Sequence, residues 1–191
     1  KQRRSIRKYL PKPVQKEVIL QVLATAGCAP SAHNSQPWRF IILQDDIVKR
    51  RLADAMAEAW AKDLQRDGIK VESDKRTERD ERFATAPVLI LACLTMVDLR
   101  RFPDSERQMC ERDLAVQSFG AALQNLLLAA HAKGLGACWF CAPAFCKETV
   151  RKILKIPDEV EPQAFVAMGY SAENPQVPTK KLLEGYCFVD I

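Results

Sequence analysis

Hydrophobic residues recur every three or four positions in four segments of the chain, which is the periodicity of helices that bury one face. The first segment begins after Pro13 and ends near Gly27, and proline and glycine favour these two ends of a helix. Asp45 and Asp46 precede the second segment, where acidic side chains stabilise a helix N-terminus. The pattern predicts helices over residues 13–27, 45–60, 110–133 and 145–154.

Runs of β-branched, aliphatic and aromatic residues alternate with these helical segments. The run at 87–94 is apolar throughout, which is typical of a central strand that is covered on both faces. Similar runs predict strands over residues 38–43, 137–140, 163–170 and 186–191. This order of elements indicates a single α+β domain over residues 1–191, a sandwich in which helices cover a mixed sheet.

The long predicted helix at 110–133 is apolar around almost its whole circumference. Its large hydrophobic residues cannot share one stripe, and they are Leu114, Val116, Phe119, Leu123, Leu126, Leu127 and Leu128. A helix of this kind needs cover on more than one side. We expect its own domain to bury one side and a second subunit to bury the other.

Composition narrows the class of protein further. With 191 residues and 48% hydrophobic content, the chain is large enough for one substantial core. No apolar run approaches the roughly 20 residues without charge that a membrane span needs. The seven cysteines are an odd number and lie mostly among apolar neighbours, unlike a disulfide framework. We therefore expect a cytoplasmic protein without a membrane partner.

The net charge of +5 could indicate nucleic acid binding, so its distribution matters. Basic and acidic side chains alternate in equal numbers over residues 62–82, which makes that segment neutral. The excess lies in residues 1–12, which hold only basic charges. A compact basic patch suits a phosphate group, and the lack of interleaved aromatic residues argues against a nucleic acid partner.

Within the basic patch, Arg3, Ser5 and Arg7 would face the same side of an extended segment. Two guanidinium groups and one hydroxyl are suitable donors for phosphate oxygens. The alternative is a solvated basic terminus, which is a common fate of such runs.

A polar loop lies between Pro30 and Pro37. Its hydroxyl and amide groups come from Ser31, Asn34, Ser35 and Gln36. His33 is the only candidate base, and no acidic residue is near it in sequence to orient it, so binding is favoured over nucleophilic catalysis. The alternative is an elaborate turn that leads into the strand at 38–43.

Cys138 and Cys141 have the C-x-x-C spacing of redox and zinc sites. They flank two bulky aromatic residues in a predicted strand, and no further pair of metal ligands lies at short spacing. We interpret both as buried hydrophobic residues and expect no metal site.

Four motifs in the same order resemble the FMN-dependent nitroreductase family. They are RRSIRKY at the start, APSAHNSQPWRF, GAALQNLLLAAHAKGLGACW and AMGYSAENP near the end. The resemblance implies a mainly antiparallel sheet and an intertwined homodimer, in which the C-terminal strand of each copy reaches over the other. It also implies two FMN sites at the subunit interface.

The resemblance implies cofactor-binding residues in four segments. The N-terminal residues matching those that hold the phosphate and ribityl chain are Arg3, Arg4, Ser5 and Arg7. The loop that borders the flavin of the other subunit matches Pro30, Ser31, Ala32 and Asn34. The segment along the isoalloxazine matches Trp139, Phe140, Cys141 and Ala142, and a phosphate contact matches Lys180 and Lys181.

The implied activity is hydride transfer from NAD(P)H through FMN to a small electron-poor acceptor, with no catalytic side chain. Nitroaromatics, quinones and enones are acceptors of this kind. Two features depart from the family pattern: Cys141 replaces an acidic residue of some members, and lysine replaces arginine at 180–181. The alternatives are the nitroreductase-like branch that reduces a deazaflavin coenzyme precursor, which the second half resembles most closely, and a flavin-binding dimer without turnover.

Overall fold

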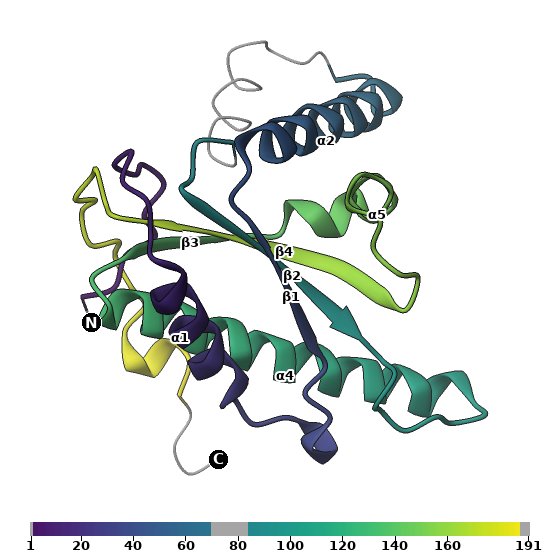
Figure 1. The fold of residues 1–191 in the computed structure, drawn as a ribbon. Helices are drawn as coiled ribbons and strands as arrows, with labels where there is room; N and C mark the ends of the chain where they lie inside the picture. The colour runs from purple at the N-terminus through teal and green to yellow at the C-terminus, as the bar shows by residue number, and fades with distance from the viewer. Residues whose placement is uncertain (1, 70–83, 188–191) are drawn as a thin grey trace.

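The computed structural model describes residues 2–69 and 84–187, and its centre is a four-stranded antiparallel sheet (Figure 1). The strands are β1 (Trp38–Leu43), β2 (Val88–Thr95), β3 (Gly136–Phe140) and β4 (Val160–Gly169). Their order across the sheet is β1-β2-β4-β3, and every neighbouring pair is antiparallel. The expected α+β fold is confirmed. The described parallel contact is a single bridge between Ser5 and Ala137.

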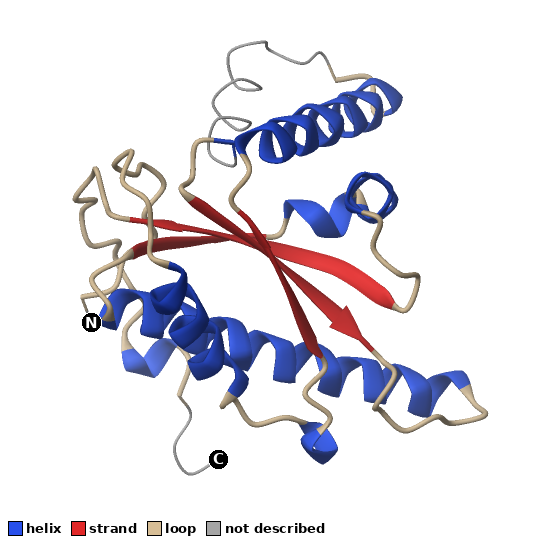
Figure 2. Ribbon diagram, viewed as in Figure 1, coloured by secondary structure: helices blue, strands red, loops and turns tan. Residues whose placement is uncertain are grey.

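Helices cover both faces of the sheet, as Figure 2 shows. They are α1 (Lys16–Gly27), α2 (Asp46–Arg66), α4 (Ser105–Ala132) and α5 (Lys147–Leu154). Helices α1 and α4 pack together on one face, and α2 and α5 pack on the other. The sheet therefore separates two hydrophobic cores.

Strand β2 supplies alternate residues to the two cores. Val88, Ile90, Ala92 and Leu94 face α1 and α4, whereas Leu89, Leu91 and Cys93 face the side of α2 and α5. All eight residues of β2 are buried. The prediction of a central strand covered on both faces is confirmed, and the period of two residues explains its division between the cores.

Three predicted helix starts were wrong. Helix α4 begins at Ser105, five residues before the predicted start, because the Asp104 carboxylate accepts a hydrogen bond from the Arg107 backbone N–H and caps the helix. Helix α5 begins at Lys147, since residues 142–145 form a separate 3₁₀ turn. Helix α1 begins at Lys16 rather than at Pro13.

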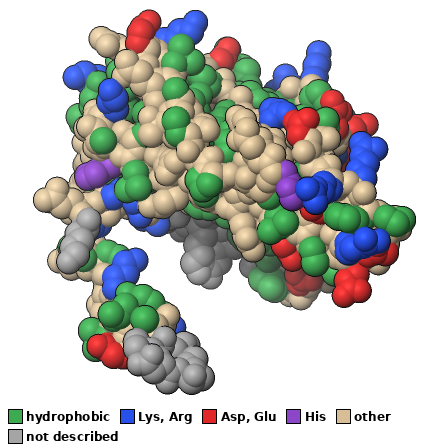
Figure 3. Space-filling view, turned by 90° about the horizontal axis from the view of Figure 1, so that it is seen from below, with side chains coloured by type: hydrophobic (Ala, Val, Ile, Leu, Met, Phe, Trp, Pro, Cys, Tyr) green, Lys and Arg blue, Asp and Glu red, His purple; other side chains and the backbone are tan. Residues whose placement is uncertain are grey.

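The predicted C-terminal strand at 186–191 is not borne out where the structure describes it. Leu183–Gly185 form a 3₁₀ turn, Tyr186 and Cys187 lie outside any strand, and 188–191 fall outside the described residues. We call residues 174–187 the C-terminal arm. Its first part, residues 175–178, lies beside the N-terminal residues and α4, and its end projects from the body of the molecule in Figure 3. Their exposed hydrophobic residues include Val177, Leu182, Leu183 and Tyr186.

The chain covers one side of helix α4 and leaves the other side exposed. Phe119, Leu123, Leu126 and Leu127 are buried, whereas Leu114, Val116 and Leu128 are 38%, 44% and 48% exposed. In the described part of the chain, no helix is long and apolar enough to span a bilayer.

Candidate functional site

The N-terminal arm, residues 2–10, is attached to the ends of β3 and β4 by backbone hydrogen bonds. Ile6 N–H donates to the Ala137 carbonyl at 3.1 Å, and Leu10 N–H donates to the Tyr170 carbonyl at 2.8 Å. The Tyr9 hydroxyl also points to the Ala167 carbonyl at 3.0 Å, and burial raises the pKa of this phenol. These contacts hold an extended basic segment in one place.

Two glycines allow the arm to approach the sheet closely. A Cβ atom built on Gly136 would lie 2.7 Å from the Ile6 side chain, and one on Gly169 would lie 2.8 Å from the Pro87 ring and 3.1 Å from the Tyr9 ring. Such distances leave no room for a side chain at either position. The Gly-x-Gly pattern at 134–136 therefore includes a packing site for the arm.

Glu173 holds the middle of the N-terminal arm. Its Oε1 atom accepts hydrogen bonds from the backbone N–H groups of Arg7 at 2.5 Å and Lys8 at 3.2 Å. A carboxylate that accepts two backbone N–H groups is a strong local anchor. Sequence reasoning missed this residue because 165 positions separate it from Lys8.

The side chains of the N-terminal arm line a basic cleft of about 750 Å³. Those predicted to hold a phosphate come together here, namely Arg3, Arg4, Ser5, Arg7 and Lys180. Gln124 and Leu128 of α4 and residues 175–178 complete the walls. No carboxylate lines the cleft among the described residues, and none pairs with Arg3 or Arg7. Lys181 is exposed and lies outside this cleft.

The chemistry of the cleft fits the phosphate and chain of FMN. Guanidinium groups bind phosphate oxygens through paired N–H donors, and Ser5 adds a hydroxyl. Leu128 and Val177 supply apolar surface beside these donors. The donor set therefore suits an anionic ligand that has a nonpolar portion.

The predicted isoalloxazine segment forms the end of β3 and the turn that follows. Trp139 packs with the core beneath α1 and α4, Phe140 packs on the opposite face, and both are half-buried. Cys138 is buried as expected, but Cys141 is exposed because β3 ends before it. The interpretation of Cys141 as a buried hydrophobic residue was wrong.

The polar loop at 30–36 has a strained backbone. His33, Asn34 and Gln36 have φ angles of 55°, 53° and 45°, which lie in the left-handed region that side chains disfavour. Ser31 Oγ accepts a hydrogen bond from the Gln36 N–H at 3.0 Å, and Ser118 Oγ of α4 accepts one from the Ala32 N–H at 3.1 Å. Strain held by surrounding contacts is frequent at binding sites.

His33 has an acidic partner that its sequence neighbourhood does not contain. Its Nε2 atom lies 3.3 Å from Oε1 of Glu111, which α4 contributes from 78 positions away. Glu111 is 5% exposed, and its other carboxylate oxygen has no hydrogen-bond partner within the described residues. No acidic residue lies near His33 in sequence, and α4 brings Glu111 to it from a distant part of the chain.

The basic cleft and the polar loop contact different parts of α4. The cleft contacts it at Gln124 and Leu128, whereas the loop contacts it at Glu111 and Ser118. Along the helix axis, Ser118 lies about 9 Å from Gln124 and about 15 Å from Leu128, because a helix rises about 1.5 Å per residue. The structure therefore brings together the predicted phosphate ligands but holds Pro30, Ser31, Ala32 and Asn34 apart from them (Figure 1).

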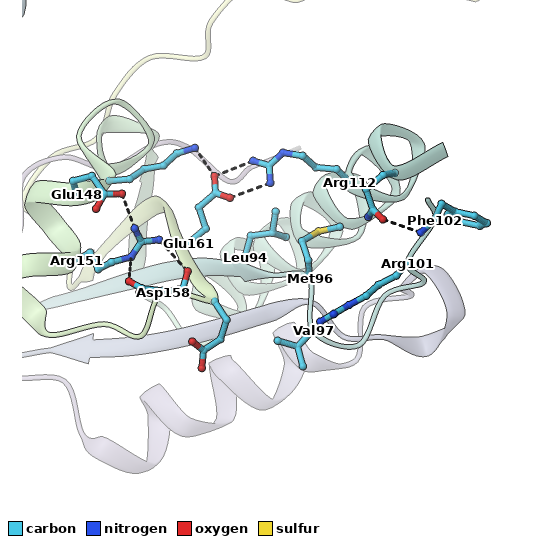
Figure 4. A pocket seen from close by; sticks show the side chains of 13 residues that line it. Leu94, Met96, Val97, Arg101, Phe102, Arg112, Glu148, Arg151, Asp158 and Glu161 are labelled. Atoms are coloured by element: carbon cyan, nitrogen blue, oxygen red, sulfur yellow. Dashed lines mark hydrogen bonds and ion pairs between the residues drawn. The ribbon is translucent and has the colours of Figure 1, made fainter. Parts of the chain in front are cut away.

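A second cleft, of about 690 Å³, lies between the ends of β2 and β4, α4 and α5 (Figure 4). Glu161 links the side chains in the wall of this cleft. It accepts two hydrogen bonds from Arg112, at 2.9 and 3.0 Å, and further hydrogen bonds from Lys147 and Gln163. Burial alone would raise the pKa of Glu161, but the bonds from Arg112 and Lys147 outweigh it and lower the pKa to about 2. This network connects β4 to both α4 and α5.

The α+β sandwich and its arginine-lined cleft suit a protein that binds a small anionic ligand, and comparison with known families shows which family the chain belongs to. The sequence profile of the Nitroreductase family matches residues 1–170. The chain therefore belongs to the nitroreductase family and is an oxidoreductase.

Three relatives illustrate the similarity. A protein of Methanothermobacter thermautotrophicus, provisionally named as an NADH dehydrogenase/NAD(P)H nitroreductase, is 34% identical over 178 residues, covering 92% of this chain and 76% of its own. A BluB-like flavoprotein from Clostridium difficile 630 has a TM-score of 0.80 at 25% identity, covering 98% of this chain and 94% of its own. A provisionally named nitroreductase from Desulfovibrio desulfuricans, solved in complex with FMN, has a TM-score of 0.74 at 27% identity, covering 100% and 94%.

Replacing Gly136 with alanine tests how the N-terminal arm is attached. The added methyl group would meet Ile6 at 2.7 Å, so we expect the Gly136→Ala substitution to displace the arm and to destabilise the fold by about 1–3 kcal/mol. Hydrogen exchange at the Ile6 and Leu10 amides should accelerate. Gly27→Ala is the control, since nothing lies within 4 Å of its added Cβ. Unchanged exchange at Ile6 in Gly136→Ala would contradict this account.

The Glu161 network predicts a pH-dependent contribution to stability. Because the folded-state pKa of Glu161 lies below its usual value, its contribution is full above about pH 4.5 and is lost as pH falls towards 2. At pH 7, we expect Glu161→Gln to lower the free energy of unfolding by roughly 1–3 kcal/mol. That difference should shrink in acid.

Denaturant unfolding from pH 7 to pH 2.5 measures this difference. The control is Glu159→Gln, because Glu159 has no ion pair with a described residue. A difference between wild type and Glu161→Gln that stays constant over this range would disprove the assignment.

Proposed function

We propose that the chain is an FMN-dependent NAD(P)H oxidoreductase that passes hydride to a small electron-poor acceptor by a ping-pong mechanism. The observation that carries the proposal is the basic cleft, where Arg3, Arg7 and Lys180 converge with no carboxylate among the described lining residues. The FMN complex of the Desulfovibrio desulfuricans relative and the name of the Methanothermobacter relative support the cofactor and the reductant. Nitroaromatics, quinones and enones are the proposed acceptors.

We infer that two copies of the chain form each FMN site. In one chain the α4 contacts of the phosphate cleft lie about 9–15 Å from the polar-loop contact at Ser118, and the cleft and the pocket at the polar loop share no lining residue. Two α4 helices that pack in opposite directions would place Ser118 of one copy near Leu128 of the other. The exposed Leu114, Val116 and Leu128 provide apolar surface for this pairing, and a two-fold axis would create two equivalent sites.

The C-terminal arm supports the same assembly. Val177, Leu182 and Tyr186 are 69%, 78% and 64% exposed in the isolated chain. Burying such side chains against a second copy would be favourable at about 25 cal/mol per Å² of apolar surface. We propose that the arm reaches over the partner, as expected for an intertwined dimer.

The protein contributes binding and orientation in this proposal. FMN, when bound, supplies the two-electron hydride chemistry. Arg3, Arg7 and Ser5 would hold its phosphate and chain, and Trp139 and Cys141 belong to the segment proposed to lie along its ring system. The polar loop of the other copy would close the site against water.

Removing the two guanidinium groups that face no carboxylate tests the cofactor assignment. Charge-assisted hydrogen bonds contribute roughly 1.5–3 kcal/mol each, so we expect Arg3→Ala/Arg7→Ala to weaken FMN binding by about 100-fold or more. Fluorescence titration of the flavin-free protein with FMN measures this change. Lys155→Ala, on the α5 C-cap, is the control and should bind FMN normally. A double variant with wild-type affinity would refute the assignment.

Mixed dimers test whether the site is shared between copies. One copy carries Arg3→Ala/Arg7→Ala, and the other carries Asn34→Trp in the polar loop, so each homodimer should lose both sites. The heterodimer should regain one site, with half the normal flavin content, because one intact cleft meets one intact loop. A heterodimer without flavin would show that each site belongs to one chain.

Rapid mixing with NADH or NADPH separates an enzyme from a flavin-binding dimer without turnover. We expect fast bleaching of the flavin absorbance, followed by recovery when an acceptor is added. An acceptor screen that covers quinones, nitro compounds and the dehydro precursor of deazaflavin coenzymes then selects the substrate class. Absence of bleaching with both nucleotides would favour the binding protein.

A further inference from the structure

We propose that His33, held by Glu111, donates the proton that accompanies hydride in the reduction of the acceptor. This inference rests on the proposed function, because it places the polar loop beside the flavin of the other copy. The structure of the loop supplies the observations that point to it.

The first observation is the geometry of the pair. Glu111 faces Nε2 of His33 at 3.3 Å, so the carboxylate favours a proton on that nitrogen in the neutral ring. Nδ1 is then the atom that gains and loses a proton. The His33 side chain is 36% exposed while that of Glu111 is 7% exposed, which leaves the imidazole accessible and shields its partner.

The second observation is a concentration of buried polar atoms around the pair. Glu111 Oε2 and Ser35 Oγ are buried without hydrogen-bond partners in the described part of the chain. Such atoms are costly unless a ligand, water or partner satisfies them. The hydrogen bond with His33 is therefore the contact that holds the Glu111 carboxylate.

The third observation is that the loop is held rigidly in a strained shape. His33 and its neighbours Asn34 and Gln36 all have positive φ angles, which residues with side chains adopt only where surrounding contacts hold them. Hydrogen bonds to Ser31 and Ser118 maintain the shape. The backbone therefore presents the imidazole in one position.

His33 also lines an open pocket of about 470 Å³ together with Asn34, Ser35, Gln36, Arg39 and Asp98. The charged groups that face it are Glu111 and the ion pair between Arg39 and Asp98, whose N–O distance is 3.3 Å. The Arg39–Asp98 ion pair has almost no net charge. The carboxylate of Glu111 is therefore the main electrostatic influence on the His33 imidazole. This pocket is large enough for a small acceptor.

The chemistry balances for a quinone or an enone. Reduction needs two electrons and two hydrogens, and the hydride that originates from NAD(P)H brings both electrons and one hydrogen. The Nδ1–H bond of the His33 imidazolium breaks, and an O–H bond forms at the carbonyl oxygen of the acceptor. His33 becomes the neutral Nε2–H form that Glu111 stabilises, and solvent returns the proton.

Nitrogen-15 NMR tests the role of Glu111 without any turnover. The chain has two histidines, His33 and His131, so long-range ¹H–¹⁵N spectra of histidine-labelled protein are readily assigned. We expect neutral His33 to be the Nε2–H tautomer in wild type and a mixture in Glu111→Gln, with His131 unchanged. A mixture in wild type, or an unchanged tautomer in Glu111→Gln, would overturn the positioning role.

Kinetics of the reduced protein test proton donation. We use His33→Asn, because asparagine also tolerates a left-handed backbone. The rate of menadione reduction should fall about 100-fold, whereas ferricyanide, which accepts electrons without a proton, should react at the wild-type rate. Reduction of the protein by NAD(P)H should not change, and His131→Gln, exposed at the far end of α4, is the control.

Two results would contradict the proposal. One is an unchanged menadione rate in His33→Asn, and the other is an equal loss with menadione and ferricyanide, which would indicate a structural role. The flavin content of the wild-type protein tests the proposed function independently of the role of His33. A protein that takes up no FMN would refute that function, and a flavin-loaded protein with these kinetics would refute only the role of His33.

Discussion

Helix α4 imposes the distance on which the organisation of the candidate site depends. A helix rises about 1.5 Å per residue and resists bending, so the loop contact at Ser118 stays about 9 Å from the cleft contact at Gln124 and about 15 Å from the one at Leu128. Neither region can move along the helix towards the other. We therefore infer that each cleft is completed by the polar loop of a second copy. The proposed dimer follows from this separation and from the apolar residues that α4 leaves exposed.

Attachment of the N-terminal arm is the second requirement. A row of arginines in a free terminus would sample many conformations and bind an anion weakly, because ordering them costs entropy. Backbone hydrogen bonds from Ile6 and Leu10, the close contact at Gly136 and the anchor at Glu173 order the segment in advance. The arginines therefore line a cleft before any ligand is present.

Much of the fold could be predicted from residue patterns. The alternating burial of β2 and the two-sided apolar character of α4 follow from hydrophobic periodicity, which reports directly on which faces are covered. Arg3, Ser5 and Arg7 line one cleft, as the period of an extended segment predicts, but Arg4, which that period places on the opposite side, lines the same cleft. Helix boundaries were predicted less accurately. The start of α4 is set by one hydrogen bond to the Asp104 cap, and the segment around it has no hydrophobic periodicity that would reveal a helix.

The remaining site residues depend on contacts between distant parts of the sequence. Glu111 is 78 positions from His33, and Glu173 is 166 positions from Arg7, so no local pattern connects them. The role of Gly136 is visible only once Ile6 lies against it. The sequence carried no signal for Glu111, because it stands beside Arg112 and Asp113 in the polar N-terminal part of α4.

Native mass spectrometry of the flavin-free protein during titration with FMN tests the central claim most directly, since it counts chains and ligands in the same particle. The account predicts that FMN appears only on dimers, up to two per dimer, and that added FMN shifts monomers into dimers. A monomer that binds one FMN as tightly as the dimer does would contradict it.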